Sequence, residues 1–190
     1  KFIRFQTEFG LPEKITHILI SEKSYTIFFE QAVSELQEWA KEKSLSDADS
    51  KRGIVLLANY FTSDVLNLLH ESGALVYDIR ITPENFAELI SLLLEKKITT
   101  PVAKVVLQEM FQAGSDPSSI IQEKDLGMSN NSSEIESMAG KIIVAFPKPA
   151  EDYKKGKHGA LQFLVGQMMK EFRGRADPEM VREALVKNLK

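Results

Sequence analysis

The residues best suited to chemistry in this 190-residue chain lie at 154–175, where a basic segment leads into a predicted helix. On a helix of 3.6 residues per turn, one face carries Gly159, Gly166, Lys170 and Arg173, within about 60° of arc. Glycine inside a helix costs about 1 kcal/mol relative to alanine, so two on one face indicate close approach of another backbone. The cations at the end of this strip could contact phosphate oxygens. The chemistry indicated is therefore binding.

Further cations lie at the start of the same helix. Lys154, Lys155, Lys157 and His158 lie beside its N-terminus, where free backbone amides favour anions. Residues 148–190 hold ten Lys and Arg against six Asp and Glu, a net charge of +4, whereas the whole chain has 24 against 27 and a net charge of -3. This asymmetry points to a polyanionic partner. Two alternatives stay open: the glycines could allow tight helix–helix packing, and the charges could form a solvated surface.

Catalytic and metal-binding motifs are missing from the sequence. The absence of cysteine excludes a disulfide framework, a thiolate zinc site and a cysteine nucleophile. His17, His70 and His158 are far apart, and no phosphate-binding loop or nucleophile elbow occurs. Asp47 and Asp49 lack the other ligands of a calcium loop and are predicted to lie in a solvated turn. We therefore expect no catalytic residue and no metal ligand.

The same sequence carries no targeting signal. It has no run of about 18 apolar residues, and its start is unlike a signal peptide. We expect no membrane partner and, by default, a bacterial cytoplasmic location, with an organellar version as the alternative.

Helical spacing of apolar residues runs through most of the chain. Ser, Thr or Asp before Pro predicts helix N-caps at 82, 100, 116 and 177, a capping box is predicted at 133–136, and C-cap glycines at 73, 114, 127 and 174. Only 74–79 is strand-like, and alone it has no partner. The predicted fold class is all-α, with helices at about 12–20, 23–43, 53–70, 83–95, 101–113, 117–123, 134–145, 157–173 and 178–189.

A serine-rich segment, 115–133, separates two predicted domains. We expect a multi-helix bundle domain at 1–118, a connection at 119–132 and a small tail domain of three to four helices at 133–190. The basic helix belongs to the tail.

The sequence resembles a known family along nearly its whole length. Residues 154–170, KKGKHGALQFLVGQMMK, and 174–178, GRADP, resemble the tail of GatB, the B subunit of the tRNA-dependent amidotransferase, a module shared with stand-alone YqeY-like proteins. Further similarity to the helical domain and its upstream region lies at 81–90, 103–111, 8–12 and 58–61. The upstream similarity favours the GatB type, because YqeY-like proteins largely lack that region.

This resemblance implies a role in a ligase complex. In the family, Glu-tRNA(Gln) or Asp-tRNA(Asn) is phosphorylated with ATP and then amidated with ammonia that the A subunit releases from glutamine. The ATP and magnesium site lies in an N-terminal cradle domain, which is absent here, so we expect no cofactor and no enzyme activity of this segment by itself. The expected partners are the tRNA elbow and the A and C subunits of the amidotransferase, and not DNA.

The resemblance also implies tRNA contacts at positions matching the family motif: Lys154, Lys157, Gly159, Gly166, Gln167 and Lys170. Lys155 and His158 join them from the basic segment, and Arg173 and Arg175 mainly from the helix-face geometry. Two other functions stay open, a stand-alone YqeY-like protein and a protein-interaction module that docks on another subunit.

Overall fold

The computed structural model describes residues 1–129 and 131–189, and this part of the chain is helical, as predicted. Its β-type pairing is limited to one isolated bridge between Ser129 and Ala176. The chain divides into two compact units, the first comprising Lys1–Lys97 and Ala103–Asp125 and the second Ile98–Val102 and Leu126–Lys190. The domain limits expected from the sequence stay a prediction. No helix in the described residues is long and apolar enough to cross a membrane.

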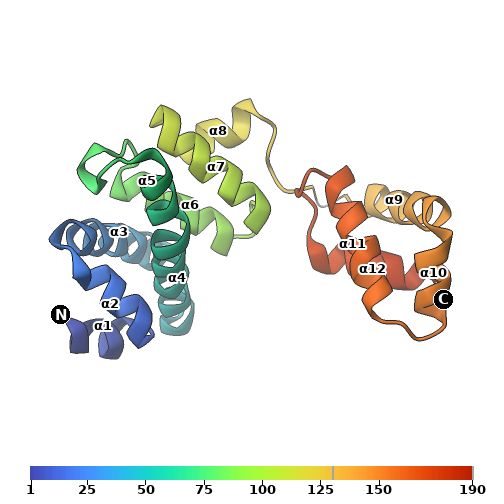
Figure 1. Ribbon diagram of the computed structural model, residues 1–190, viewed down its shortest axis with the longest axis horizontal. Coiled ribbons are helices and arrows are strands. Elements are labelled where there is room, and N and C mark those ends of the chain that lie inside the picture. The colour runs from blue at the N-terminus through green and yellow to red at the C-terminus, as the bar shows by residue number, and fades with distance from the viewer. Residues whose placement is uncertain (130, 190) are drawn as a thin grey trace. The chain divides into compact units, whose positions relative to one another are not determined.

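The first unit is built around an aromatic core between α3 and α6, which pack against each other (Figure 1). The Phe28 ring lies 5.5 Å from that of Phe61 and 5.9 Å from that of Phe86. The elements, in chain order, are α1 (Phe2–Phe9), α2 (Glu13–Ser21), α3 (Lys23–Glu42), α4 (Asp47–Tyr60), a π-helix η1 (Phe61–Val65), α5 (Leu66–Ser72), a 3₁₀-helix η2 (Val76–Asp78), α6 (Pro83–Leu94), α7 (Thr100–Ala113) and α8 (Pro117–Glu123).

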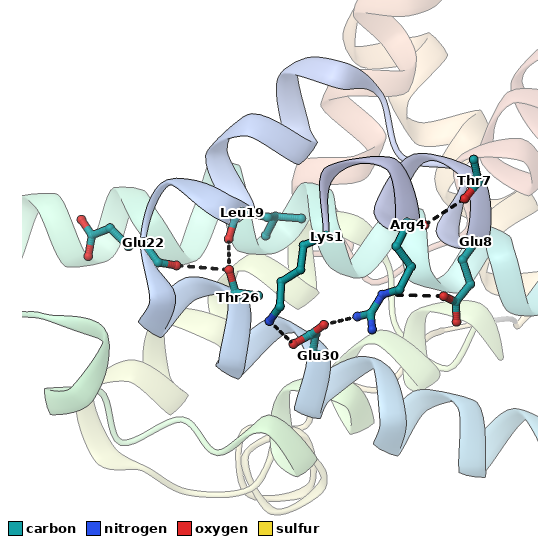
Figure 2. A network of polar contacts seen from close by, with 8 residues as sticks. All are labelled: Lys1, Arg4, Thr7, Glu8, Leu19, Glu22, Thr26 and Glu30. Carbon is teal, nitrogen blue, oxygen red and sulfur yellow. Dashed lines mark hydrogen bonds and ion pairs between the residues drawn. The ribbon is translucent and has the colours of Figure 1, made fainter.

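Helix α1 was not predicted, because it has no side-chain cap and only eight residues. Tertiary contacts hold it instead. The Phe5 ring is fully buried and lies 5.4 Å from that of Phe29 on α3. Lys1 and Arg4 both pair with the Glu30 carboxylate of α3, with Lys1 Nζ 2.9 Å from Glu30 Oε2 (Figure 2). Packing rather than local propensity therefore specifies this helix.

Apart from the first residues of α7, the described part of the second unit contains four helices: α9 (Ser132–Ala145), α10 (Pro147–Lys154), α11 (Gly159–Glu171) and α12 (Pro178–Leu189). Helix α12 packs against α9 and α11, and α10 packs against α11. One apolar core joins them, to which α11 contributes Leu161, Leu164, Val165, Met168 and the adjoining Phe172.

Several capping predictions are confirmed. Thr82 Oγ1 accepts a hydrogen bond from the Asn85 amide at 3.1 Å, and Asp116 Oδ1 accepts one from the Ser119 amide at 2.8 Å. Gly73 and Gly114 directly follow helices and adopt the left-handed conformation expected of C-caps. Gly174 is also left-handed, but its place as a C-cap was wrong, because α11 ends at Glu171 with Phe172 as its C-cap. The capping box at 133–136 was wrong, because α9 begins earlier and its N-cap is Asn131. Gly127 was also wrong, since α8 ends at Glu123 with Lys124 as its C-cap.

Four element predictions need correction. Asp47 and Asp49 form the first turn of α4, where Ser46 Oγ accepts from the Asp49 amide at 3.1 Å, rather than a solvated turn. The strand-like 74–79 contains the 3₁₀-helix η2. The single helix expected at 53–70 is divided by η1. Helix α10 was missed although Pro147 at its first position suits a helix start, where no amide hydrogen bond is lost.

Candidate nucleic-acid interface

Helix α11 has one buried and one exposed face. Its core residues fix its orientation in the second unit, and the opposite stripe consists of Gly159, Phe163, Gly166 and Lys170, all exposed. These positions are spaced by four, three and four residues, so they follow one another along a single side of the helix. At a rise of 1.5 Å per residue, Gly159 and Lys170 are about 17 Å apart along the axis.

The two glycines leave the helix backbone bare on either side of Phe163. A Cβ atom built on Gly159 or Gly166 would meet no atom within 4 Å in the described structure. Tight helix–helix packing within the described unit, the structural alternative for these residues, is therefore not observed. The free-energy cost of a mid-helix glycine at 166 is not offset by a packing contact there.

The basic segment surrounds the turn between α10 and α11. Lys154 ends α10, Gly156 has a left-handed backbone with φ of 90°, and His158 is the N-cap residue of α11. The Lys154, Lys155, Lys157 and His158 side chains are exposed. This turn also borders an open hollow in the surface, lined by Tyr153, Lys154, Gly156, His158, Val186 and Leu189.

Two of these lysines are paired with carboxylates of α10. Lys157 Nζ lies 2.9 Å from Asp152 Oδ1, and Lys155 Nζ lies 3.5 Å from Glu151 Oε2. The hydrogen bond from Lys157 holds the pKa of the Asp152 carboxyl below its usual value. A phosphate that binds Lys157 therefore competes with Asp152 for the same ammonium group.

At the other end of the face the structure separates the predicted residues. Lys170 stands exposed in the last turn of α11, but the helix ends at Glu171. Arg173 follows in a left-handed turn with φ of 51°, so its placement on the helical arc was wrong, although its side chain is exposed. Arg175 is half-buried, and its carbonyl accepts a hydrogen bond from the Ser129 amide at 3.0 Å.

Gln167, the remaining predicted contact, is also half-buried. The exposed predicted residues thus form two cationic ends, 154–158 and 170–173, with Gly159 and Gly166 between them. Sequence reasoning missed Phe163, although its position one turn after Gly159 was available as a signal. Within the described residues, no group of three or more His, Cys, Asp or Glu side chains could hold a metal ion.

Comparison with known proteins identifies the family. Residues 27–189 match the family model described as the GatB domain, so the chain belongs to this family. Its relatives are parts of amidotransferases. The B subunit of the aspartyl/glutamyl-tRNA(Asn/Gln) amidotransferase of Carboxydothermus hydrogenoformans is 36% identical over 182 residues, which cover 96% of this chain and 35% of the relative.

Proteins of the same name show the same extent of similarity. Those from Caldanaerobacter subterraneus and Thermotoga maritima are each 35% identical over 186 residues, which cover 98% of this chain and 36% of the relative. The chain spans about a third of the length of these curated relatives. It is therefore a GatB-family segment, of the type found in the B subunit of the amidotransferase.

Proposed function

We propose that this chain is the tRNA-binding helical and tail segment of an amidotransferase GatB subunit, and that the exposed face of α11 docks on the elbow of a tRNA. One observation carries the proposal: Gly159 and Gly166 leave an open helix surface between two groups of exposed cations. A folded RNA can lie against such a surface and place phosphates at both of its ends.

Recognition of this kind depends on shape. Structured RNA is commonly bound through its phosphates, hydroxyls and outline rather than through base sequence. The absence of side chains at Gly159 and Gly166 lets sugars or bases approach the helix backbone. Lys154 and Lys157 at one end and Lys170 at the other supply positive charge, and binding that neutralises phosphates falls steeply with salt.

The family relationship supplies the context of this proposal. Relatives named as B subunits of the amidotransferase support a role in amidation of Glu-tRNA(Gln) or Asp-tRNA(Asn). We propose that this segment holds the tRNA while a cradle domain outside this sequence uses ATP and magnesium, in a complex with the A and C subunits. The segment itself contributes binding and no catalytic residue. Similarity over 98% of the chain favours this role over that of a stand-alone YqeY-like protein.

The test is a titration of the 190-residue chain with bacterial tRNA(Gln) transcript at two salt concentrations. We expect Gly166→Glu and Lys170→Glu to weaken binding about tenfold or more, because each places a carboxylate among phosphates. Both positions are exposed, so helical content measured by circular dichroism should not change. Lys141→Glu on α9 is the matched control, since Lys141 is exposed and lies on another helix.

Two outcomes would contradict the proposal. Equal affinity of the wild type and both α11 variants would show that the α11 face is not the contact surface. A wild-type chain that binds no tRNA even at low salt would instead favour a docking surface for another protein of the complex.

A further inference from the structure

Phe163 is the feature of α11 that cation binding does not explain. Its side chain is 44% exposed, whereas Leu161 and Leu164 on the same helix are 7% and 0% exposed. In the described part of the second unit, Val144 is the other large apolar side chain with such exposure. Phe163 lies between Gly159 and Gly166 along the stripe, so the residues one turn before and one turn after it have no side chains.

A second aromatic residue fixes the Phe163 ring. Phe146, at the junction of α9 and α10, meets it edge to face, with ring centroids 5.4 Å apart and an angle of 81° between the rings. Such an arrangement is a favourable aromatic contact. It restrains one side of an exposed ring, so that a ligand meets a flat apolar surface with little ordering cost.

The surroundings select the chemistry of the ligand. Phe163 stands on the same face as Lys170, and the basic segment 154–158 precedes Gly159. Lys154 and Lys170 are both exposed, and among the described residues no carboxylate lies within ion-pair distance of either ammonium group. A ligand that fits must combine flat π surfaces with repeated negative charge. RNA has both, because each nucleotide joins a base to a phosphate.

We infer that Phe163 stacks on a nucleobase exposed at the surface of the bound RNA, with Phe146 as the positioning residue for its ring. This inference rests on the proposed tRNA-binding function and adds a specific apolar contact to it. Base–aromatic stacking tolerates any base, because every base has a π face. Phe163 therefore contributes affinity for an exposed base without reading sequence.

The experiment separates stacking from charge by measuring Kd of tRNA(Gln) transcript for the full chain over a salt series. We expect Phe163→Leu to raise Kd roughly five- to hundredfold, the range found when a stacking aromatic residue is removed. The slope of log Kd against log salt should stay at the wild-type value, because no phosphate contact is lost. Phe163→Trp should bind at least as tightly as the wild type.

Two further variants serve as controls for the Kd and the salt slope. Lys170→Gln should lower the slope by roughly 0.7–0.9, the value for one phosphate contact. Tyr77→Leu, at a ring 76% exposed in the first unit, should leave both Kd and slope unchanged. Thermal unfolding followed by circular dichroism verifies that each variant is folded.

The outcomes distinguish this inference from the function on which it rests. If the wild type binds tRNA and Phe163→Leu binds it equally tightly, the stacking inference is overturned and the proposed function stands. If Phe163→Leu and Phe163→Trp weaken tRNA binding equally, the inference is also overturned, because the shape of the side chain rather than an aromatic ring would then matter. A reduced salt slope for Phe163→Leu has the same consequence, since the change would have displaced cations. A wild type that binds no tRNA overturns both.

Discussion

Replacing Gly166 by alanine should stabilise the protein and weaken its binding to RNA. Gly166 lies in the interior of α11, and an added Cβ would meet no atom within 4 Å. Alanine has the higher helix propensity and also reduces the freedom of the unfolded chain. The same methyl group would project into the surface against which we propose that RNA packs.

The two effects can be estimated separately. The gain in helix propensity is about 0.8–1.0 kcal/mol, and nothing in the described structure opposes it. For a domain of 60–100 residues, this raises Tm by roughly 4–8 °C. A methyl group forced into a well-packed contact costs about 1–3 kcal/mol, which corresponds to a Kd raised roughly five- to hundredfold.

Gly140→Ala is the matched control for this measurement. Gly140 lies inside α9, and a Cβ atom there also meets nothing within 4 Å. It should raise the thermal stability of the second unit by a similar amount, while tRNA affinity stays within about twofold of the wild type. Thermal unfolding by circular dichroism and a fluorescence titration with tRNA transcript give the two quantities for each variant.

Comparison of the two variants tests the proposed contact at Gly166. If Gly166→Ala binds tRNA as tightly as Gly140→Ala does, the RNA does not approach the α11 backbone at this position. If Gly166→Ala lowers Tm, the space around the glycine is not open and the geometry itself is wrong.

Three further predictions concern charge, pH and the core. Asp152→Asn should strengthen tRNA binding about twofold to fivefold at low salt, because Lys157 loses a competing carboxylate; titration at about 50 and 200 mM salt checks this. Asp116→Ala should cost about 1 kcal/mol of stability by removing the α8 N-cap. The Ser119 amide lowers the Asp116 pKa, so the carboxylate's contribution to stability is present at neutral pH and is lost as pH falls below about 4. Urea unfolding checks this, because Asp116→Asn retains a cap and its stability should depend less on pH. Leu164→Ala should destabilise the second unit by about 2–5 kcal/mol in the same assay, since Leu164 is fully buried in its core.

Local signals in the sequence predicted most of the fold. Thr82 and Asp116 precede prolines, and their side chains accept hydrogen bonds from the amides expected of an N-cap. Apolar periodicity gave the extents of α3, α6 and α12 to within a residue or two, because each buries one continuous stripe.

The elements that were missed depend on contacts distant in sequence. Helix α1 is held by Phe29 and Glu30 of α3, which no local pattern can show. The π-helix within the expected helix 53–70 has a local cause instead. The Thr62 and Ser63 hydroxyl groups donate to the Ala58 and Asn59 carbonyls at 2.8 and 2.7 Å, an alternative to regular backbone hydrogen bonding that the apolar spacing does not reveal.

The sequence predicted one part of the candidate site correctly and another part wrongly. Periodicity placed Gly159, Gly166 and Lys170 on one exposed face, as the structure shows. It failed at Arg173, because the helix ends at Glu171 and periodicity has no meaning beyond a helix end. The roles of the predicted contacts stay a prediction, which the titrations above address.

The glycines of α11 have a further effect, on the motion of the backbone itself. Without a side chain at position 166, water reaches the peptide groups of the middle turn, and the helix there resists opening less than a turn of alanines would. Hydrogen–deuterium exchange should therefore be faster at the amides of 166–170 than at those of 182–186 on α12. A ligand that covers this turn would slow the exchange, so amide protection would outline the occupied surface residue by residue.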